Sequence, residues 1–224
     1  MNFMGYVREN DKVGSRNYVA VIPSVVCAND VAMAVVAQTD NTRGIYHHQG
    51  CCQLPPDLER VTESLIGIGS HPNVGAALIV SLGCEGTDVD RLVEEISKTG
   101  KPVEIIRIQK LGGTSNAIAA GIDAAQKLAI GISGLQREPV DISNYIMSIK
   151  CGASDATSGL ASNCVLGYVA DKVVDLGGTV VFGETTEFIG AEHILARRGR
   201  TPDVGDRIYE IVNQMEERSK SMGI

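Results

Sequence analysis

Short apolar runs that alternate with segments of helical spacing constrain the fold of this 224-residue chain more than any other feature. Residues 18–23 and 76–81 are almost continuously apolar, which is typical of strands buried on both faces of a parallel sheet. Further strands are expected at 45–48, 103–108, 145–149 and 179–182, and helices at 30–38, 58–68, 89–98, 114–131, 160–176 and 203–219. This alternation predicts an α/β fold, with a mostly parallel sheet and helices on both faces in Rossmann-like layers.

A polar segment at 134–141, which contains glycine and proline, interrupts the alternation. Such a break is typical of a linker or a domain boundary. The sequence therefore predicts an α/β sheet domain over residues 1–136 and a second, smaller α/β segment over residues 137–224.

Composition excludes several functional classes. The formal net charge is −7 and lysine and arginine do not cluster, so we expect neither nucleic acid nor a membrane surface as partner. No apolar run approaches the roughly 20 residues of a membrane span. Six cysteines without a secretory signal indicate reduced thiols and a cytoplasmic protein. A hydrophobic content of 44% supplies a core, and an enzyme acting on small molecules fits best.

Residues that could bind a metal or a substrate follow the first four predicted strands. In open α/β sheets, ligands bind beyond the carboxyl ends of the strands, where these residues should converge. Imidazole and thiolate are strong ligands for transition metals, and glycine-rich backbone at a helix start can hold a carboxylate. The alternative is that the thiols and imidazoles are packing residues. The candidates are Asn29, His47, His48, Cys51, Cys84, Gly112, Gly113 and Thr114.

The second segment carries a further set of candidates after its own strands. Cys151, Ser154 and Asp155 follow the strand at 145–149, whereas Glu184 and His193 follow the strand at 179–182. Arg197 comes next, and two interpretations of it stay open. It either neutralises the C-terminal end of a helix or anchors a carboxylate of the substrate.

Taken together, these segments resemble the altronate/galactarate dehydratase family, whose large catalytic portion also occurs as the large subunit of sulfolactate sulfo-lyase. Each motif is short, but the set covers nearly the whole chain in the expected order. The motifs include Val13-Gly14-x-Arg16-Asn17-Tyr18, Cys27-x-Asn29, His47-x-x-Gly50-Cys51, Gly83-Cys84-Glu85, Gly112-Gly113-Thr114, Cys151-Gly152-x-Ser154-Asp155 and Glu184-Thr185-x-Glu187.

The resemblance implies a hydro-lyase that depends on Fe2+ and removes water from a sugar acid such as altronate or galactarate to give a 2-keto-3-deoxy acid. It implies proton transfer by His47, His193 and Glu184. We expect metal ligation by His48, Cys51, Cys84 and Cys151, with Zn2+ or Mn2+ as alternative metals. Substrate binding would fall to the remaining candidates, which are Asn29, Gly112, Gly113, Thr114, Ser154, Asp155 and Arg197.

Two alternatives to a dehydratase stay open. One is the large subunit of a sulfolactate sulfo-lyase, a carbon–sulfur lyase, and the other is an inert fragment or scaffold subunit. The family's single-chain members have a small N-terminal module and further glycine-rich segments, so we expect either a separate small subunit of the N-terminal type or a chain truncated relative to the family. A homo-oligomer is also expected.

Overall fold

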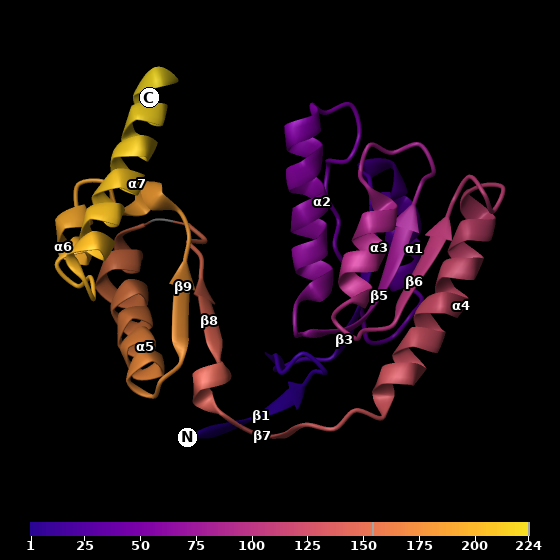
Figure 1. Cartoon of the computed structure of the whole chain (residues 1–224), viewed down its shortest axis with the longest axis horizontal. Coiled ribbons are helices and arrows are strands. Elements are labelled where there is room, and N and C mark those ends of the chain that lie inside the picture. Colours follow the sequence, from indigo (N-terminus) through magenta and orange to yellow (C-terminus); the bar gives the residue numbers. More distant parts are fainter. Residues whose placement is uncertain (154, 224) are drawn as a thin grey trace. The chain divides into compact units, whose positions relative to one another are not determined.

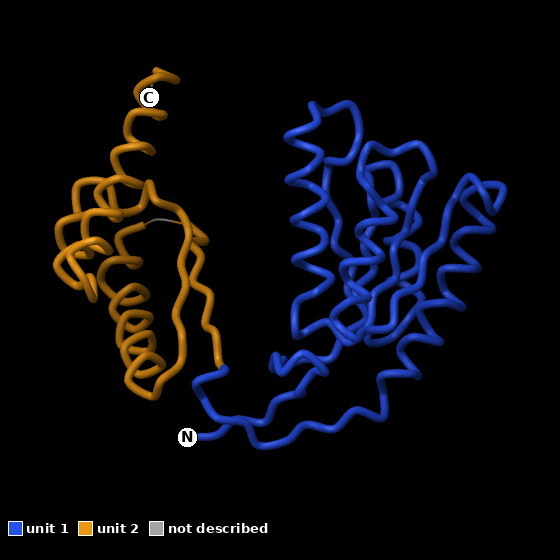
Figure 2. The backbone as a smooth tube through the Cα atoms, viewed as in Figure 1, with its two compact units in different colours: residues 1–144 blue, residues 145–224 orange. Residues whose placement is uncertain are grey.

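The computed structural model describes residues 1–153 and 155–223, and the chain divides into two compact units (Figure 2). The N-terminal unit is Met1–Asn144 and the C-terminal unit is Tyr145–Ile224. Both units contain helices and strands, so the prediction of a mixed α/β structure is confirmed. Among the described residues, no helix combines the length and the apolar composition that crossing a membrane requires.

A four-stranded parallel sheet forms the centre of the N-terminal unit (Figure 1). Its strands lie in the order β4 (Thr42–Gly44), β3 (Tyr18–Pro23), β5 (Val74–Ser81) and β6 (Val103–Arg107). Every residue of β5 is buried. Because a central parallel strand has one core on each face, its sequence is continuously apolar rather than alternating.

Helices cover both faces of this sheet. α1 (Asn29–Val36) and α4 (Thr114–Ser133) pack on the face that carries Val19 and Val21. The opposite face carries Ala20 and Ile22. It packs against α2 (Pro55–Ser70) and α3 (Val89–Ser97). Successive residues of one strand therefore contribute to two separate hydrophobic cores.

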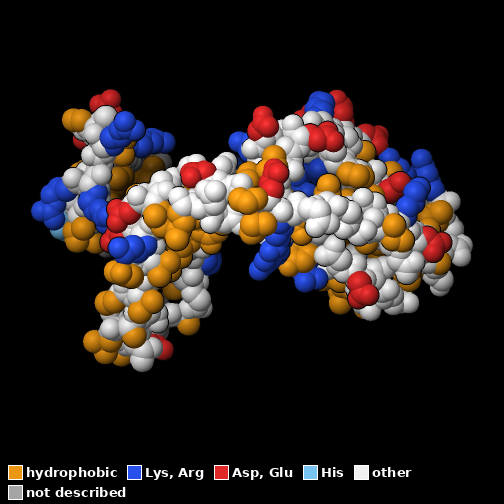
Figure 3. All heavy atoms as spheres, turned by 90° about the horizontal axis from the view of Figure 1, so that it is seen from below, with side chains coloured by type: hydrophobic (Ala, Val, Ile, Leu, Met, Phe, Trp, Pro, Cys, Tyr) orange, Lys and Arg blue, Asp and Glu red, His pale blue; other side chains and the backbone are white. Residues whose placement is uncertain are grey.

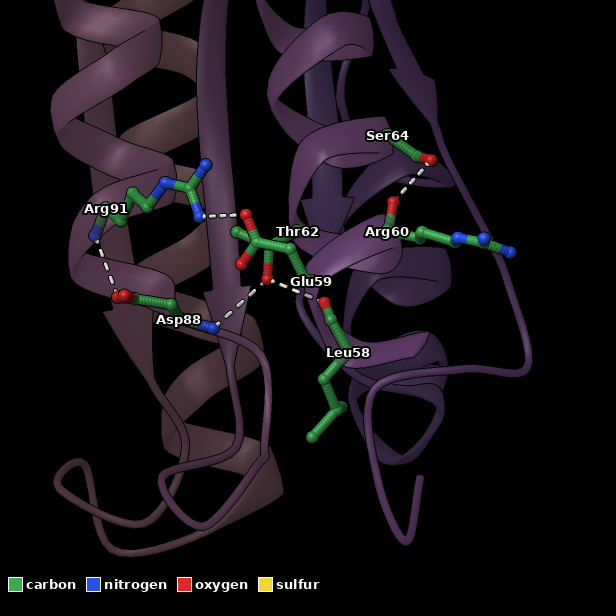
Figure 4. Close-up of polar contacts among 7 residues, drawn as sticks. All are labelled: Leu58, Glu59, Arg60, Thr62, Ser64, Asp88 and Arg91. Atoms are coloured by element: carbon green, nitrogen blue, oxygen red, sulfur yellow. Dashed lines mark hydrogen bonds and ion pairs between the residues drawn. The ribbon is translucent and has the colours of Figure 1, made fainter. Parts of the chain in front are cut away.

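Polar contacts join α2 to α3 and fix the start of α3 (Figure 4). The guanidinium of Arg91 lies 2.6 Å from the carboxylate of Glu59. The Asp88 side chain caps α3 by accepting a hydrogen bond from the Arg91 amide at 3.0 Å. The Asp88 amide donates to the hydroxyl of Thr62 at 3.4 Å. The loop that follows β5 is thereby anchored at its far end.

The strand predicted at 45–48 is wrong, because β4 ends at Gly44 and residues 45–48 form a loop. The main-chain ladder between β4 and β3 continues as far as the bond from the Ile45 amide to the Val21 carbonyl. The next acceptor along β3 is the carbonyl of Pro23, and the imidazole of His47 occupies it at 2.7 Å. A side chain thus replaces the main-chain donor that would extend the strand.

Three short strands outside the predicted ones form a small antiparallel sheet. It consists of β2 (Val13–Gly14), β1 (Asn2–Val7) and β7 (Glu138–Asp141), in that order. The segment predicted as a linker therefore contains a strand of the N-terminal unit. Buried Arg8 follows β1 and donates to the carbonyl of Pro72 at 2.8 Å, which joins this sheet to the end of α2.

The C-terminal unit is built on two parallel strands, β8 (Ile146–Ile149) and β9 (Thr179–Phe182). Its longer helices are α5 (Asn163–Asp175), which follows a π-helical turn at Ser158–Ser162, and α7 (Pro202–Ser221), which contacts the short α6 (Glu192–Ala196). Short 3-10 turns occur in the chain at Val26–Ala28, Ile142–Asn144 and Thr185–Phe188.

Replacing Leu92 with alanine should lower the free energy of unfolding of the N-terminal unit by about 2–5 kcal/mol, because the side chain is fully buried between α3 and the sheet. Leu54→Ala is the matched control, since this leucine is 71% exposed and its truncation should change stability by less than about 0.5 kcal/mol. Urea unfolding followed by circular dichroism measures both changes. Equal shifts would contradict this description of the core.

Candidate functional site

Three loops meet at the carboxyl ends of β3, β4 and β5 and are joined by both main-chain and side-chain hydrogen bonds. The Val26 amide donates to the Gln49 carbonyl, and the Gly86 amide donates to the Gly50 carbonyl, both at 2.9 Å. Gly50 has φ +98°, and a Cβ there would lie 2.5 Å from the Ser24 carbonyl oxygen. Glycine is therefore required where the loops come closest.

Glu85 places a fixed carboxylate at this edge. Its Oε1 accepts hydrogen bonds from the hydroxyls of Ser24 at 2.7 Å and Ser81 at 2.5 Å, and both serines are fully buried. Its Oε2 accepts from the Gly83 amide at 2.5 Å. The carboxylate borders a cleft of about 240 Å³ that extends to Arg107. Two strand ends and one loop thus hold a negative charge in a defined orientation.

The pKa of Glu85 is lower than its usual value of 4.5, although its partial burial acts in the opposite direction. Burial raises the pKa because it disfavours the charged form. Hydrogen bonds from Ser81, Ser24 and main-chain amides favour the carboxylate more strongly, so the net direction is downward. Glu85 is therefore ionised at neutral pH.

Both ring nitrogens of His47 have partners. Nε2 lies 2.7 Å from the Pro23 carbonyl, and Nδ1 accepts from the Gln49 amide at 3.2 Å. This pattern fits the neutral tautomer with the proton on Nε2. In this conformation His47 holds the loop after β4 in place, and a role in proton transfer would require one of these bonds to open.

Asn29, the first residue of α1, lies next to His47. Its amide nitrogen donates to the His47 carbonyl at 2.8 Å. Its side-chain oxygen Oδ1 is buried and has no hydrogen-bond partner in the described structure. Buried acceptors are normally satisfied, so this oxygen is available to a hydroxyl donor from a ligand or to a water molecule. The position fits the prediction that Asn29 contacts substrate, which stays a prediction.

The thiols of Cys51 and Cys52 lie 3.5 Å apart in the loop after β4, and both side chains are exposed. The hydrogen bond with Cys52 is the main cause that raises the pKa of Cys51, and the nearby thiols of Cys27 and Cys84 add to it. The predicted ligands Cys51 and Cys84 are therefore close enough to interact electrostatically.

No three His, Cys, Asp or Glu side chains converge closely enough to hold a metal ion among the described residues. The predicted ligand His48 is exposed. As they stand, the candidate ligands therefore do not fit a preformed iron centre.

The glycine pair before α4 uses its amides within its own turn. Gly113 donates to the Ile108 carbonyl at 3.0 Å and Gly112 donates to the Gln109 carbonyl at 3.2 Å. Both have positive φ, at +121° and +80°, which allows the chain to turn sharply from β6 into the helix. The unsatisfied amides of a helix lie in its first turn, so Thr114 is better placed than the glycines to bind an anion.

The C-terminal unit contains a cleft of about 800 Å³ beside the carboxyl ends of β8 and β9. Cys151 and Glu184 both line it, so two of the predicted residues come together. Glu184 forms an ion pair with Lys150 at 2.5 Å and accepts from the Cys151 amide at 3.1 Å. The hydrogen bond from Lys150, followed by that from Cys151, lowers the pKa of Glu184.

Other candidates in this unit are less clearly placed. The Asp155 carboxylate accepts from the Thr157 amide at 2.7 Å and from the Ser158 amide, so it caps the helical segment that follows. His193 and Arg197 are exposed on and beside α6 and are not among the residues that line the cleft. Ser154 lies outside the described residues.

Each of the two units matches a known family model. Residues 5–133 match the model of the second domain of D-galactarate dehydratase/altronate hydrolase. The chain belongs to this family. Residues 142–224 match the model of the C-terminal domain of D-galactarate/altronate dehydratase.

Relatives in the family carry the names of several lyases. The chain is 39% identical to (2R)-sulfolactate sulfo-lyase subunit beta of Chromohalobacter salexigens over 98% of its own length and 56% of the relative. It is 30% identical to altronate dehydratase of Bacillus subtilis, over 96% of the chain and 45% of the relative. It is 31% identical to altronate dehydratase of Escherichia coli, over 95% of the chain and 44% of the relative. The chain thus spans about half the length of these relatives.

Sequence reasoning did not select Glu85 or Lys150. Both follow predicted strands, in Gly83-Cys84-Glu85-Gly86 and at the end of the run 145–149. Two serines could have indicated Glu85. Ser81 ends one apolar strand and Ser24 directly follows the other, and a buried hydroxyl needs a hydrogen-bond partner. That signal indicates a polar partner without identifying which residue supplies it.

The stabilising effect of Glu85 should disappear in acid. Because the folded-state pKa is depressed, the ionised carboxylate contributes stability above its usual value of 4.5, and that contribution is lost as the pH falls through the folded-state pKa. The wild-type chain should therefore be more stable than a Glu85→Gln variant at neutral pH, and the difference should shrink below about pH 4.5. Denaturant unfolding across this range measures it, and a constant difference would contradict the assignment.

Proposed function

We propose that this chain provides the catalytic portion of a sugar-acid dehydratase that converts an aldonate or aldarate, such as altronate or galactarate, into a 2-keto-3-deoxy acid. The match of both units to the dehydratase family carries this proposal. Dehydration of such an acid needs a base for the proton α to the carboxylate and an acid for the departing β-hydroxyl. Candidates for both roles line one cleft of the C-terminal unit.

In the proposed reaction, Glu184 accepts the α proton. The electron pair of the C–H bond then forms the carbon–carbon double bond as the β C–O bond breaks. Lys150 donates the proton that converts the leaving hydroxide into water, and the enol product tautomerises to the keto acid. Both residues line a cleft of about 800 Å³, a size typical of small-molecule sites, which supports these roles. Their ion pair keeps Glu184 ionised and Lys150 protonated, but it lowers the pKa of Glu184 and raises that of Lys150, so both proton transfers require the substrate to open the pair.

Substrate hydroxyls need hydrogen-bond partners, and the same cleft offers Ser158, Ser162 and Asn163. Substrate contact by Asn29, whose Oδ1 has no partner in the described structure, remains a prediction. Proton transfer by His47 and His193, and substrate binding by Arg197, remain predictions from the family resemblance.

A second candidate is elimination of sulfite from a sulfonated hydroxy acid. It is favoured by the 39% identity to (2R)-sulfolactate sulfo-lyase subunit beta, compared with 30–31% for the two altronate dehydratases. The chemistry differs only in the leaving group. Sulfite departs without a proton at neutral pH, so Lys150 would stabilise its charge instead of protonating it.

Iron is proposed as the cofactor from the resemblance alone, and the reaction above includes no step through a metal. When bound, Fe2+ would act as a Lewis acid that stabilises developing negative charge. A separate small subunit of the N-terminal type, a homo-oligomer and a cytoplasmic location are likewise part of the proposal.

Glu184→Gln should lower kcat/KM by about 10²–10⁴-fold, because the amide cannot accept the α proton. Glu216→Gln is the matched control, since Glu216 lies on α7 in an exposed pair with Lys220 and should leave the rate unchanged. Keto-acid formation from altronate and galactarate and sulfite release from sulfolactate are measured in parallel, with ferrous iron supplied. If the wild-type chain forms neither product, the proposal that this chain alone catalyses either elimination is contradicted.

Metal binding can be tested independently of turnover. If the proposal is correct, the wild-type chain purified anaerobically and loaded with Fe2+ retains near-stoichiometric iron, whereas Cys51→Ser loses most of it. Cys164→Ser is the control, because this exposed cysteine lies on α5 and is not a candidate ligand. Elemental analysis for iron, zinc and manganese gives the result. Equal metal content in Cys51→Ser and wild type would contradict ligation by Cys51.

A further inference from the structure

A polar cleft of about 310 Å³ lies in the N-terminal unit at the amino ends of the parallel strands. It is bordered by residues that directly precede β3 and β4 and by the segment between α4 and β7. Figure 3 is viewed from this end of the sheet, and lysine and arginine side chains project from the surface seen there. β3 spans six residues, or roughly 20 Å, between this end and the candidate site at the carboxyl ends. One small ligand therefore cannot occupy both places.

Two arginines give this cleft its charge. Arg16 comes from the segment between β2 and β3, and Arg137 comes from the segment before β7, so only the fold brings them together. Glu138, the neighbour of Arg137, is exposed and does not line the cleft. Neither guanidinium forms an ion pair among the described residues, and no carboxylate borders the cleft. Two unpaired cations in one cleft attract an anion, even in a chain with a net charge of −7.

Contacts with Tyr6 and Arg8 hold these arginines in place. The guanidinium of Arg137 lies over the ring of Tyr6, 5.3 Å from its centre, and such a contact between a cation and an aromatic ring is attractive. Buried Arg8 lies 5.5 Å from the centre of the same ring and donates to the Arg16 carbonyl at 3.0 Å. The Arg137 side chain and the Arg16 main chain are therefore positioned before a ligand arrives, which lowers the entropic cost of binding.

Asn17 and Asn41 add amide groups to the lining of the cleft. The Asn17 side chain is fully engaged, because it accepts from Arg8 and donates to the Ile132 carbonyl, both at 2.9 Å. Asn41 donates through its side-chain nitrogen to the Asn17 carbonyl at 2.9 Å. This leaves the Oδ1 of exposed Asn41 without a protein partner among the described residues. That oxygen can accept a hydrogen bond from a hydroxyl group of a ligand.

We propose that this cleft binds a small organic dianion that carries hydroxyl groups, such as an aldarate or a sugar phosphate. A guanidinium presents paired N–H donors that match two oxygens of a carboxylate or a phosphate, so Arg16 and Arg137 bind the charged groups. Asn41 accepts from a hydroxyl of the same ligand. The volume of about 310 Å³ is at the lower end of the range for small-molecule sites. The site is independent of the proposed reaction, which uses none of these residues.

The test titrates the full chain with galactarate, glucose 6-phosphate and neutral galactitol and follows hydrogen exchange with each probe. We expect at least one dianion, but not galactitol, to slow exchange in residues 14–18 and 133–137. Slowing by galactarate alone identifies a dicarboxylate as the ligand, slowing by glucose 6-phosphate alone identifies a phosphate ester, and slowing by both supports the shared chemistry. If neither dianion slows these segments, the proposal is wrong. Slowing in residues 149–163 reports the cleft of the C-terminal unit, so the two proposals succeed or fail separately.

Two variants locate the contact. Arg16→Gln and Arg137→Gln should each weaken dianion binding at this cleft by at least about tenfold, because each removes a charged pair of donors. Both side chains are exposed, so the thermal unfolding midpoint should stay unchanged and show that the fold is intact. Arg218→Gln is the matched control, since this exposed arginine lies in the last turn of α7 in the other unit. Equal affinity of all three variants, measured by calorimetry, would contradict the assigned site.

Discussion

The burial of a parallel sheet on both faces determines where this molecule can carry polar chemistry. β5 has no exposed residue, and its neighbour β3 exposes only part of Tyr18. Polar side chains are excluded from such strands unless they have a partner, so they gather where the strands end. Ser24 and Ser81 lie at that limit, and their hydroxyls are satisfied by Glu85. The site at this edge therefore follows from the packing of the core.

The same constraint explains which parts of the fold the sequence predicts. Residues 18–23 and 76–81 could be assigned because burial on two faces gives an uninterrupted apolar run. β1 and β7 could not, because they pair with each other across more than 130 residues and each is partly exposed. Short edge strands have no periodicity strong enough to distinguish them from loops.

The candidate site shows a similar division. Asn29 and His47 were both predicted near strand ends, and they are in contact in the structure. Cys151 and Glu184, predicted after two other strands, line one cleft. The sequence could not reveal that the ring of His47 is held on both sides, because those bonds depend on where β4 stops. The roles of Glu85 and Lys150 depended on side-chain partners from other segments, Ser24 and Glu184, which local spacing does not indicate.

The main-chain hydrogen bonds between the loops have an evolutionary consequence. The bonds between Val26 and Gln49 and between Gly86 and Gly50 involve amide and carbonyl groups that nearly every residue possesses. Side chains that face solvent in these loops can therefore change while the backbone keeps its course. Such an arrangement lets one scaffold diversify its chemistry by substitution alone, in keeping with relatives named for the loss of water and for the loss of sulfite.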